Sequence, residues 1–352
     1  MNTAENKRKY IYYNIIYFWV FVFYLWMAAQ VPYTHDDWRW GIHAGMQQFI
    51  RAEVNSRYAG NLFVILMTRS KLLKVLIMGC VCFLLPYMTG QLLAHQNDLE
   101  DKQFERFVLS NIFFLTINRD IWTQTYSWVA GFANYNISAI FLLLWIKEVK
   151  RAYEKPLTRD GNSCVQLTAY FVIGIFGQLF LENLAIFHAF LGVFLCVTYL
   201  KKRNSIPARV VLMTSGAMIG LLIAFNNDLY RTLFATGSAY SGVRSIPLLG
   251  KRTIAEKIYM TALTGLRLTL GLYTKNIVIV VAILVLLSSL IWKIRHNKRY
   301  VYINCLFIIY FAIGHLYHVY KPVQAHWKQI LDFCVTGCFA AVITSEIVYT
   351  FF

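Results

Sequence analysis

Residues 10–29, YIYYNIIYFWVFVFYLWMAA, form a nearly unbroken apolar and aromatic run, and the polar stretch YTHDDWRWG at 33–41 follows closely. A helix of about 20 residues is long enough to cross the hydrocarbon core of a bilayer. Two adjacent carboxylates, Asp36 and Asp37, are costly at the end of such a span unless they lie in water or take part in chemistry. The two stretches therefore predict a membrane helix that leads into a functional polar loop.

The composition of the whole chain is typical of a polytopic membrane protein. Hydrophobic residues make up 58% of the 352 residues and charged residues 14%, against about 25% charged in soluble domains. Many further apolar runs of similar length occur, which predicts an all-α bundle of transmembrane helices in a lipid bilayer. The net charge of +17 comes largely from short Lys and Arg clusters between these runs, so membrane topology explains it and no nucleic-acid partner is predicted.

The basic clusters also predict the orientation of the chain. Lys7–Lys9, Lys147–Arg151, Lys201–Arg203 and Lys293–Arg299 mark cytoplasmic segments by the positive-inside rule. We therefore expect a multi-pass protein of the cell membrane with both termini in the cytoplasm. The expected spans, about ten, lie near 10–30, 74–95, 107–122, 134–147, 165–182, 184–200, 209–225, 276–292, 300–318 and 330–350.

Two long outer segments, 30–73 and 226–275, interrupt this single transmembrane domain of residues 1–352. Within the first segment, basic residues recur through Gly45–Leu73. This pattern favours amphipathic helix lying along the outer membrane surface. Asn61–Met67 is an alternative short span, which would reverse part of the topology.

Polar and aromatic residues without a simple structural explanation gather on the predicted outer face. They are candidates for substrate binding beside the two candidate catalytic carboxylates. The set is His35, Trp38, Arg57, Asn61, Trp128, Asn134, Tyr135, Glu182, Asn183, Arg244, Lys321, His326 and Lys328. No Cys or His spacing typical of a metal site occurs, so no metal or other cofactor is predicted, although a divalent cation at Asp36 or Asp37 stays an alternative.

This combination of side chains suits transfer of a sugar from a lipid phosphate. A carboxylate within hydrogen-bond distance can deprotonate an acceptor hydroxyl, and it can stabilise oxocarbenium character at the sugar carbon. Arg and Lys stabilise the departing phosphate. Trp and Tyr offer flat apolar surfaces to the faces of a sugar.

Three motifs resemble those of a known superfamily: His35-Asp36-Asp37-Trp38, Ser56–Asn61, and Trp128-x-x-Gly131-x-x-Asn134-Tyr135. Over roughly residues 1–200, the chain is similar to the GT-C superfamily of polytopic glycosyltransferases, in particular to a bacterial branch of membrane proteins encoded with cell-envelope genes. The resemblance implies a polyprenyl-phosphate sugar donor, inverting transfer on the outer face, and a glycan or lipid acceptor. It also implies that Asp36 or Asp37 is the catalytic base.

Other interpretations remain open at the level of sequence. The basic segment Arg244–Lys275 also suits a polysaccharide polymerase, and His188 within a span would suit a membrane acyltransferase. A flippase or transporter of lipid-linked glycans would place charges within the membrane. Few charged residues lie inside the apolar runs of this chain, and Arg267 and Glu346 are the exceptions. The carboxylate pair can also be a solvated turn, and the aromatic residues can belong to an interfacial belt.

Overall fold

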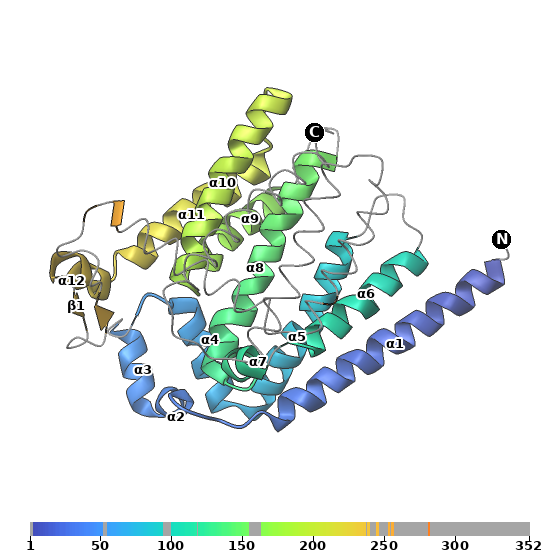
Figure 1. Ribbon diagram of the computed structural model, residues 1–352, viewed down its shortest axis with the longest axis horizontal. Helices are drawn as coiled ribbons and strands as arrows, with labels where there is room; N and C mark the ends of the chain where they lie inside the picture. Colours follow the sequence, from blue (N-terminus) through green and yellow to red (C-terminus); the bar gives the residue numbers. More distant parts are fainter. Residues whose placement is uncertain are drawn as a thin grey trace, which may run out of the picture. The chain divides into compact units, whose positions relative to one another are not determined.

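The described part of the chain is almost entirely α-helical, as expected. The computed structural model describes residues 3–51, 55–93, 100–117, 119–154 and 163–236, with the further residues 238–239, 244–245, 253, 255–256 and 281. The helices (Figure 1) are α1 (Thr3–Gln30), α2 (Asp37–Gly41), α3 (His43–Ile50), α4 (Tyr58–Arg69), α5 (Lys71–Leu93), α6 (Glu100–Leu115), α7 (Arg119–Thr125), α8 (Val129–Glu154), α9 (Cys164–Gly177), α10 (Glu182–Arg203), α11 (Ala208–Phe225) and α12 (Asp228–Thr236). Two-residue strands β1 (Ser238–Ala239) and β2 (Arg244–Ser245) pair antiparallel after them.

The chain divides into two compact units. The first comprises Met1–Phe114 and Arg119–Ile246, and the second comprises Leu115–Asn118 and Pro247–Phe352. All that follows concerns the first unit. The expectation of one domain over 1–352 stays a prediction, since most of the second unit lies outside the described residues.

Several helices of the described chain are long and apolar enough to cross a membrane, which confirms the expected class of protein. They are Arg8–Gln30, Lys71–Leu93, Val129–Tyr153, Glu182–Arg203 and Ala208–Phe225. These five correspond to the spans expected near 10–30, 74–95, 134–147, 184–200 and 209–225.

The remaining expected spans are shorter, divided or outside the described residues. The span near 165–182 corresponds to the shorter apolar helix α9, and the span near 107–122 is divided between α6 and α7. The last three expected spans lie, apart from Val281, outside the described residues. The total of about ten spans therefore stays a prediction.

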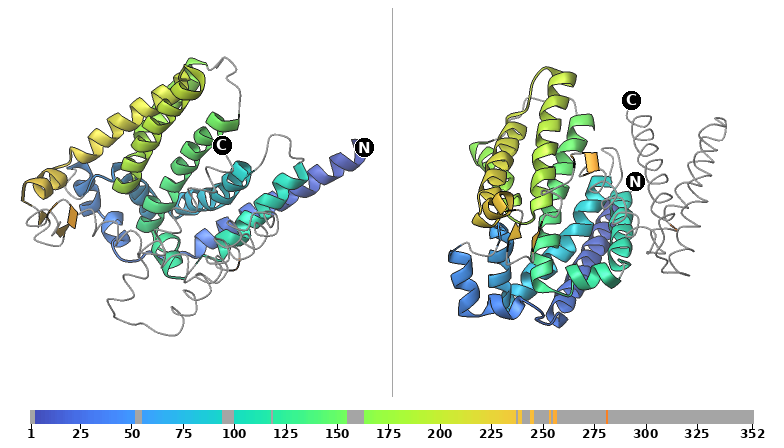
Figure 2. Two further views of the ribbon diagram at one scale, coloured as in Figure 1. Left: turned by 45° about the horizontal axis from the view of Figure 1, so that its top comes forward. Right: turned by 60° about the vertical axis from the view of Figure 1, so that its left-hand side comes forward.

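Glycines allow the closest helix packing, between α9 and α11. A Cβ added at Gly174 would lie 2.3 Å from the Met213 carbonyl oxygen, and one added at Gly216 would lie 2.3 Å from the Phe171 carbonyl oxygen. Small residues let membrane helices approach until their backbones touch. Figure 2 shows α10 and α11 side by side, and α8 and α9 complete this group of four contacting helices.

Successive long helices run in opposite directions, so their connections gather at two ends. At one end, the Asp37 carboxylate accepts from the Ala130 N–H, and Asn227 Nδ2 donates to the Tyr58 hydroxyl. At the opposite end, Lys150 Nζ donates to the Leu92 carbonyl. The basic cluster near Lys150 and the acidic pair thus lie at opposite ends of the bundle, as the expected topology requires; the membrane side of each end stays a prediction.

The structure differs from the sequence expectation at α4. Six of its twelve residues, including Asn61 and Val64, are buried, and α4 packs against α2, α5 and α8. The expected amphipathic surface helix over Gly45–Leu73 therefore does not extend through α4. Ile50 in α3 is 73% exposed, and the place of α3 at the membrane surface stays a prediction. Packing α4 inside the bundle brings Arg57 and Asn61 next to the start of α8.

Candidate active site

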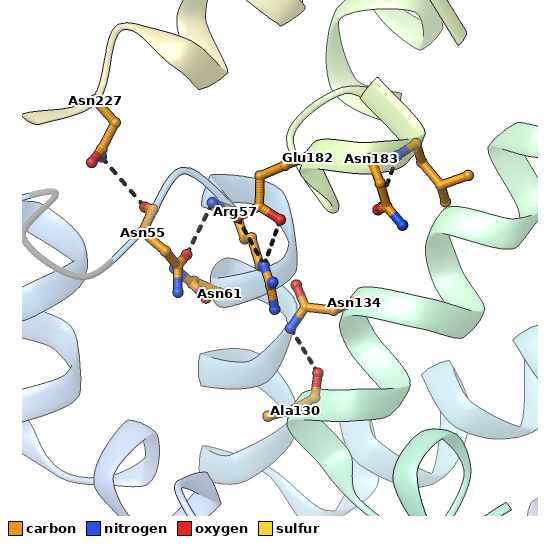
Figure 3. A network of polar contacts seen from close by, with 9 residues as sticks. Asn55, Arg57, Asn61, Ala130, Asn134, Glu182, Asn183 and Asn227 are labelled. Carbon is orange, nitrogen blue, oxygen red and sulfur yellow. Dashed lines mark hydrogen bonds and ion pairs between the residues drawn. The ribbon is translucent and has the colours of Figure 1, made fainter. Parts of the chain in front are cut away.

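A cavity of about 120 Å³ lies at the end of the bundle that carries the acidic pair. Residues from four separate segments line it, and we call it the Asp36 cavity. Its lining is Asp36, Arg39, Trp40, Gln48, Asn55, Arg57, Asn61, Trp128, Ala130 and Asn134. Figure 3 shows part of this wall, with Arg57 between Glu182 and Asn134.

The two adjacent carboxylates have different surroundings. Asp37 is 1% exposed, and it accepts from three backbone N–H groups, those of Thr34 at 2.9 Å, Val129 at 3.3 Å and Ala130 at 2.9 Å. Val129 and Ala130 begin α8, so the Asp37 charge lies at the positive end of that helix. Asp37 therefore ties the loop after α1 to the start of α8.

Burial raises the pKa of the Asp37 carboxyl above its ordinary value. The three backbone N–H groups stabilise the ionised form and oppose the rise, whereas the negative charge of Asp36 adds to it. Removal of the Asp37 carboxylate from water raises its pKa by more than the hydrogen bonds lower it. Asp37 thus occupies a site where its charge is costly but its oxygens have fixed partners.

Asp36 is exposed and lines the cavity. Its Oδ1 accepts from Trp128 Nε1 at 3.0 Å, which leaves Oδ2 without a partner among the described residues. The His35 ring contacts the Trp128 ring edge-on, with 5.8 Å between centroids. His35 has a φ of 52°, an uncommon left-handed conformation for a residue with a side chain. The backbone turn at His35 lets the two carboxylates point to different partners.

The Arg57 guanidinium forms its ion pair through Nε alone. Its Nε donates to both Glu182 oxygens, at 3.2 and 3.1 Å, and the two side chains are 23% and 17% exposed. Glu182 begins α10, so this ion pair joins α10 to the start of α4. The two terminal amino groups of Arg57 have no partner in the described part of the chain, and they are available to an oxyanion.

Carboxamide side chains form much of the remaining wall. Asn55 Oδ1 accepts from Asn61 Nδ2 at 2.9 Å and from the Arg57 backbone N–H at 3.0 Å. Asn134 Nδ2 donates to the Ala130 carbonyl at 2.8 Å. A Cβ added at Gly60 would lie 2.1 Å from Asn134 Oδ1, so the glycine makes room for this amide.

The structure brings five of the sequence-predicted residues into the cavity wall: Asp36, Arg57, Asn61, Trp128 and Asn134. Three more, His35, Asp37 and Glu182, contact members of that wall.

The other predicted residues lie elsewhere. Trp38 is 65% exposed and packs edge-on against Tyr33, and Tyr135 is 40% exposed. Asn183 Oδ1 accepts from the neighbouring Leu184 N–H. These three side chains do not line the Asp36 cavity.

The predicted cations after residue 240 are not placed at the cavity. Arg244 lies in β2, opposite Ala239, and Lys321, His326 and Lys328 lie outside the described residues. Their roles stay predictions.

Five lining residues are not among the sequence-based candidates: Arg39, Trp40, Gln48, Asn55 and Ala130. Arg39 and Trp40 belong to the motif that holds the acidic pair, so their position was a usable signal. Gln48 and Asn55 lie in the segment expected on the membrane surface. Nothing local marks them, because they join the site only when α4 packs into the bundle.

Two further observations concern the alternatives. His188, the residue that would serve an acyltransferase, is fully buried against Trp145, with 6.0 Å between ring centroids, and is not part of the cavity wall. Within the described residues, no three His, Cys, Asp or Glu side chains gather as metal ligands.

Comparisons with known proteins identify no relative. No family model matches the chain, and no curated protein or solved structure matches it.

Proposed function

We propose that this protein is a membrane glycosyltransferase that moves a sugar from a polyprenyl phosphate to an acceptor hydroxyl, with Asp36 as the base. One observation carries the proposal: an exposed carboxylate and an arginine with two free amino groups line the same cavity. A reaction that removes a proton and releases a phosphate needs both groups. The carboxamides and Trp128 around them suit a polyhydroxylated substrate.

In the proposed reaction, Asp36 Oδ2 takes the proton of the acceptor hydroxyl as its oxygen attacks the anomeric carbon. The bond between that carbon and the phosphate oxygen breaks, and the phosphate leaves with the electron pair. Arg57 stabilises the negative charge on the phosphate through its terminal amino groups. The products are the new glycoside, the polyprenyl phosphate and a protonated Asp36. Attack from the face opposite the phosphate inverts the anomeric configuration.

Asp36 is favoured over Asp37 as the base for a geometric reason. A base must reach the substrate proton within hydrogen-bond distance. Both Asp37 oxygens already accept backbone N–H groups in a buried position, whereas Asp36 has one free oxygen at the cavity. Asp37 then has a positioning role, because it fixes the loop that carries Asp36 against α8, the helix that also supplies Asn134.

The test is mass spectrometry of envelope glycans from cells that lack the gene, complemented with the wild type or with Asp36→Asn. The wild type should restore a glycan or glycolipid that is one sugar residue larger, and Asp36→Asn should not restore it at equal protein abundance. Asn226→Ala is the matched control, because this exposed side chain lies at the same end of the bundle and outside the cavity wall. Full restoration by Asp36→Asn would refute the assignment of the base.

A further inference from the structure

The cavity wall carries polar atoms that the protein itself does not satisfy. Asn61 is 5% exposed and donates through Nδ2 to Asn55, while its Oδ1 has no partner among the described residues. Asn134 is 7% exposed, and its buried Oδ1 also has no hydrogen-bond partner there. Buried carboxamide oxygens normally have partners, because an unsatisfied one costs free energy.

Two more carboxamides line the cavity with donor or acceptor groups that have no partner in the described chain. Gln48 on α3 makes no side-chain hydrogen bond with the described chain, and Asn55 uses only its oxygen. A carboxamide has both donors and acceptors, and so has a hydroxyl group. Four carboxamides around one small cavity therefore suit a ligand that bears several hydroxyl groups.

We propose that the Asp36 cavity binds one pyranose ring of the acceptor, and that Asn61 and Gln48 select it through its hydroxyl groups. This inference rests on the proposed function, and it specifies the acceptor as a terminal sugar residue of a glycan or glycolipid. The sugar ring occupies the cavity with one hydroxyl on Asp36 Oδ2. Its other hydroxyls contact the carboxamides.

The cavity volume limits the ligand to a single ring. A protein cavity of about 150 Å³ holds one benzene molecule, and the Asp36 cavity measures about 120 Å³. Asp36 and Arg39 in its lining are exposed, so the cavity is open to water and takes one face of a sugar ring while the rest of the ring stays in solvent. The next residue of the acceptor then lies outside the cavity.

The position of Asp36 distinguishes acceptor from donor. The base must touch the hydroxyl that attacks, so a ring held beside Asp36 in the cavity is the ring that supplies that hydroxyl. The donor phosphate is then expected at the terminal amino groups of Arg57 in the same wall. A donor sugar in the cavity would instead separate Asp36 from the attacking oxygen.

The test measures sugar binding without any transfer reaction. Saturation-transfer NMR with the full-length protein in nanodiscs would use methyl glycosides of glucose, galactose, mannose and N-acetylglucosamine, with glycerol as the polyol control. At least one glycoside should bind and glycerol should not. Asn61→Leu and Gln48→Leu should each weaken that binding about three- to tenfold, the effect of one lost hydrogen bond. Asn226→Leu, an exposed asparagine outside the cavity, should leave it unchanged.

Gln48→Leu is the variant that is not expected to disturb folding, so it keeps the test decisive if Asn61→Leu misfolds. The Gln48 side chain has no hydrogen bond to lose within the described chain, whereas Asn61 is buried and bonded to Asn55. Undiminished glycoside binding in both variants, or no binding of any glycoside, would overturn the inference.

Two patterns of results separate the inference from the proposed function. If the glycosides bind at these residues but envelope glycans are unchanged in cells lacking the gene, the sugar subsite stands and the transferase proposal fails. If glycans change while the binding variants have no effect, or the glycoside competes with the donor rather than with the acceptor, the transferase stands and the acceptor subsite fails.

Discussion

Asp36 and Asp37 are neighbours in sequence, and we predict that replacing each by Asn affects a different property of the protein. Asp37→Asn should lower stability, and Asp36→Asn should abolish transfer while the fold is kept. The Asp37 carboxylate accepts three backbone N–H groups through two oxygens. Asn has one carbonyl oxygen, and its NH₂ group cannot accept, so at least one backbone N–H loses its partner.

The magnitude follows from two opposing effects. A buried donor left without a partner costs about 1–3 kcal/mol, and loss of the charge at the start of α8 costs about 0.5–1 kcal/mol more. Relief of the charge burial that raises the pKa of Asp37 offsets part of this. We expect a net loss of about 1–3 kcal/mol, which lowers Tm by about 2–12 °C for a unit of this size.

The same group gives stability a pH dependence of known sign. Because the folded pKa of Asp37 is raised above the ordinary value of 3.8, the folded protein binds this proton more tightly than the unfolded chain. The contribution of Asp37 to stability is therefore greatest below pH 3.8 and falls as the pH rises through the folded pKa. Asp37→Asn should remove this decline from the pH profile of Tm.

For Asp36→Asn the amide oxygen can still accept from Trp128 Nε1, and the residue is exposed. Its Tm should stay within about 1–2 °C of the wild type, as for most surface substitutions, while transfer falls by about 10²–10⁴-fold. Both variants are compared by intrinsic tryptophan fluorescence in detergent and by glycan mass spectrometry. If Asp37→Asn has the Tm of the wild type but no activity, the division of roles between the two carboxylates is wrong.

Three other experiments test the surrounding structure. A double-mutant cycle of Arg57→Ala and Glu182→Ala should give a coupling of about 1 kcal/mol by thermal unfolding, because the pair is only partly exposed; additive effects would contradict the pairing. Gly131→Ala should destabilise by about 1–3 kcal/mol in the same assay, since its Cβ would lie 2.0 Å from the Gln124 carbonyl oxygen, and an unchanged Tm would contradict that packing. In a cysteine-free background, an impermeant thiol reagent on intact cells should label a cysteine at Asn226 but not one at Lys202, and the reverse would invert the topology.

The sequence was sufficient for the class of fold because membrane helices are a local signal. A span requires about 20 apolar residues in succession, and five of the expected spans before residue 225 correspond to helices long and apolar enough to cross a membrane. The signal was misleading around α4 and the start of α5, where Arg57, Arg69 and Lys74 suggested a helix on the membrane surface. Lys74 is instead 3% exposed, with its ammonium donating to the Val31 carbonyl and 4.8 Å from the centroid of the Tyr33 ring.

The candidate site was predictable in its residue types and not in its geometry. Acidic, basic and aromatic residues near span ends indicated one polar end of the bundle, and five of them line one cavity. Their individual roles depend on partners far along the chain: Arg57 pairs with Glu182 across 125 residues, and Asp37 reaches Ala130 across 93. Local pattern carries no information about such pairs, so the sequence favours Asp36 over Asp37 only narrowly. The contacts of the Asp37 carboxylate with the first N–H groups of α8 distinguish the two residues.

This dependence on distant contacts has a consequence for how the site is assembled. Asp36 and Arg57 belong to the first outer segment, yet α8 holds Asp36 in place through Asp37 and Trp128, and α10 holds Arg57 through Glu182. The proposed base and the proposed phosphate-binding cation are therefore fixed by different helices. A displacement of α8 relative to α10 changes the distance between the two groups without breaking either anchor. The proposed transfer requires Asp36 on the acceptor and Arg57 on the donor phosphate at the same time, so the packing of α8 against α10 sets the separation at which that reaction is feasible.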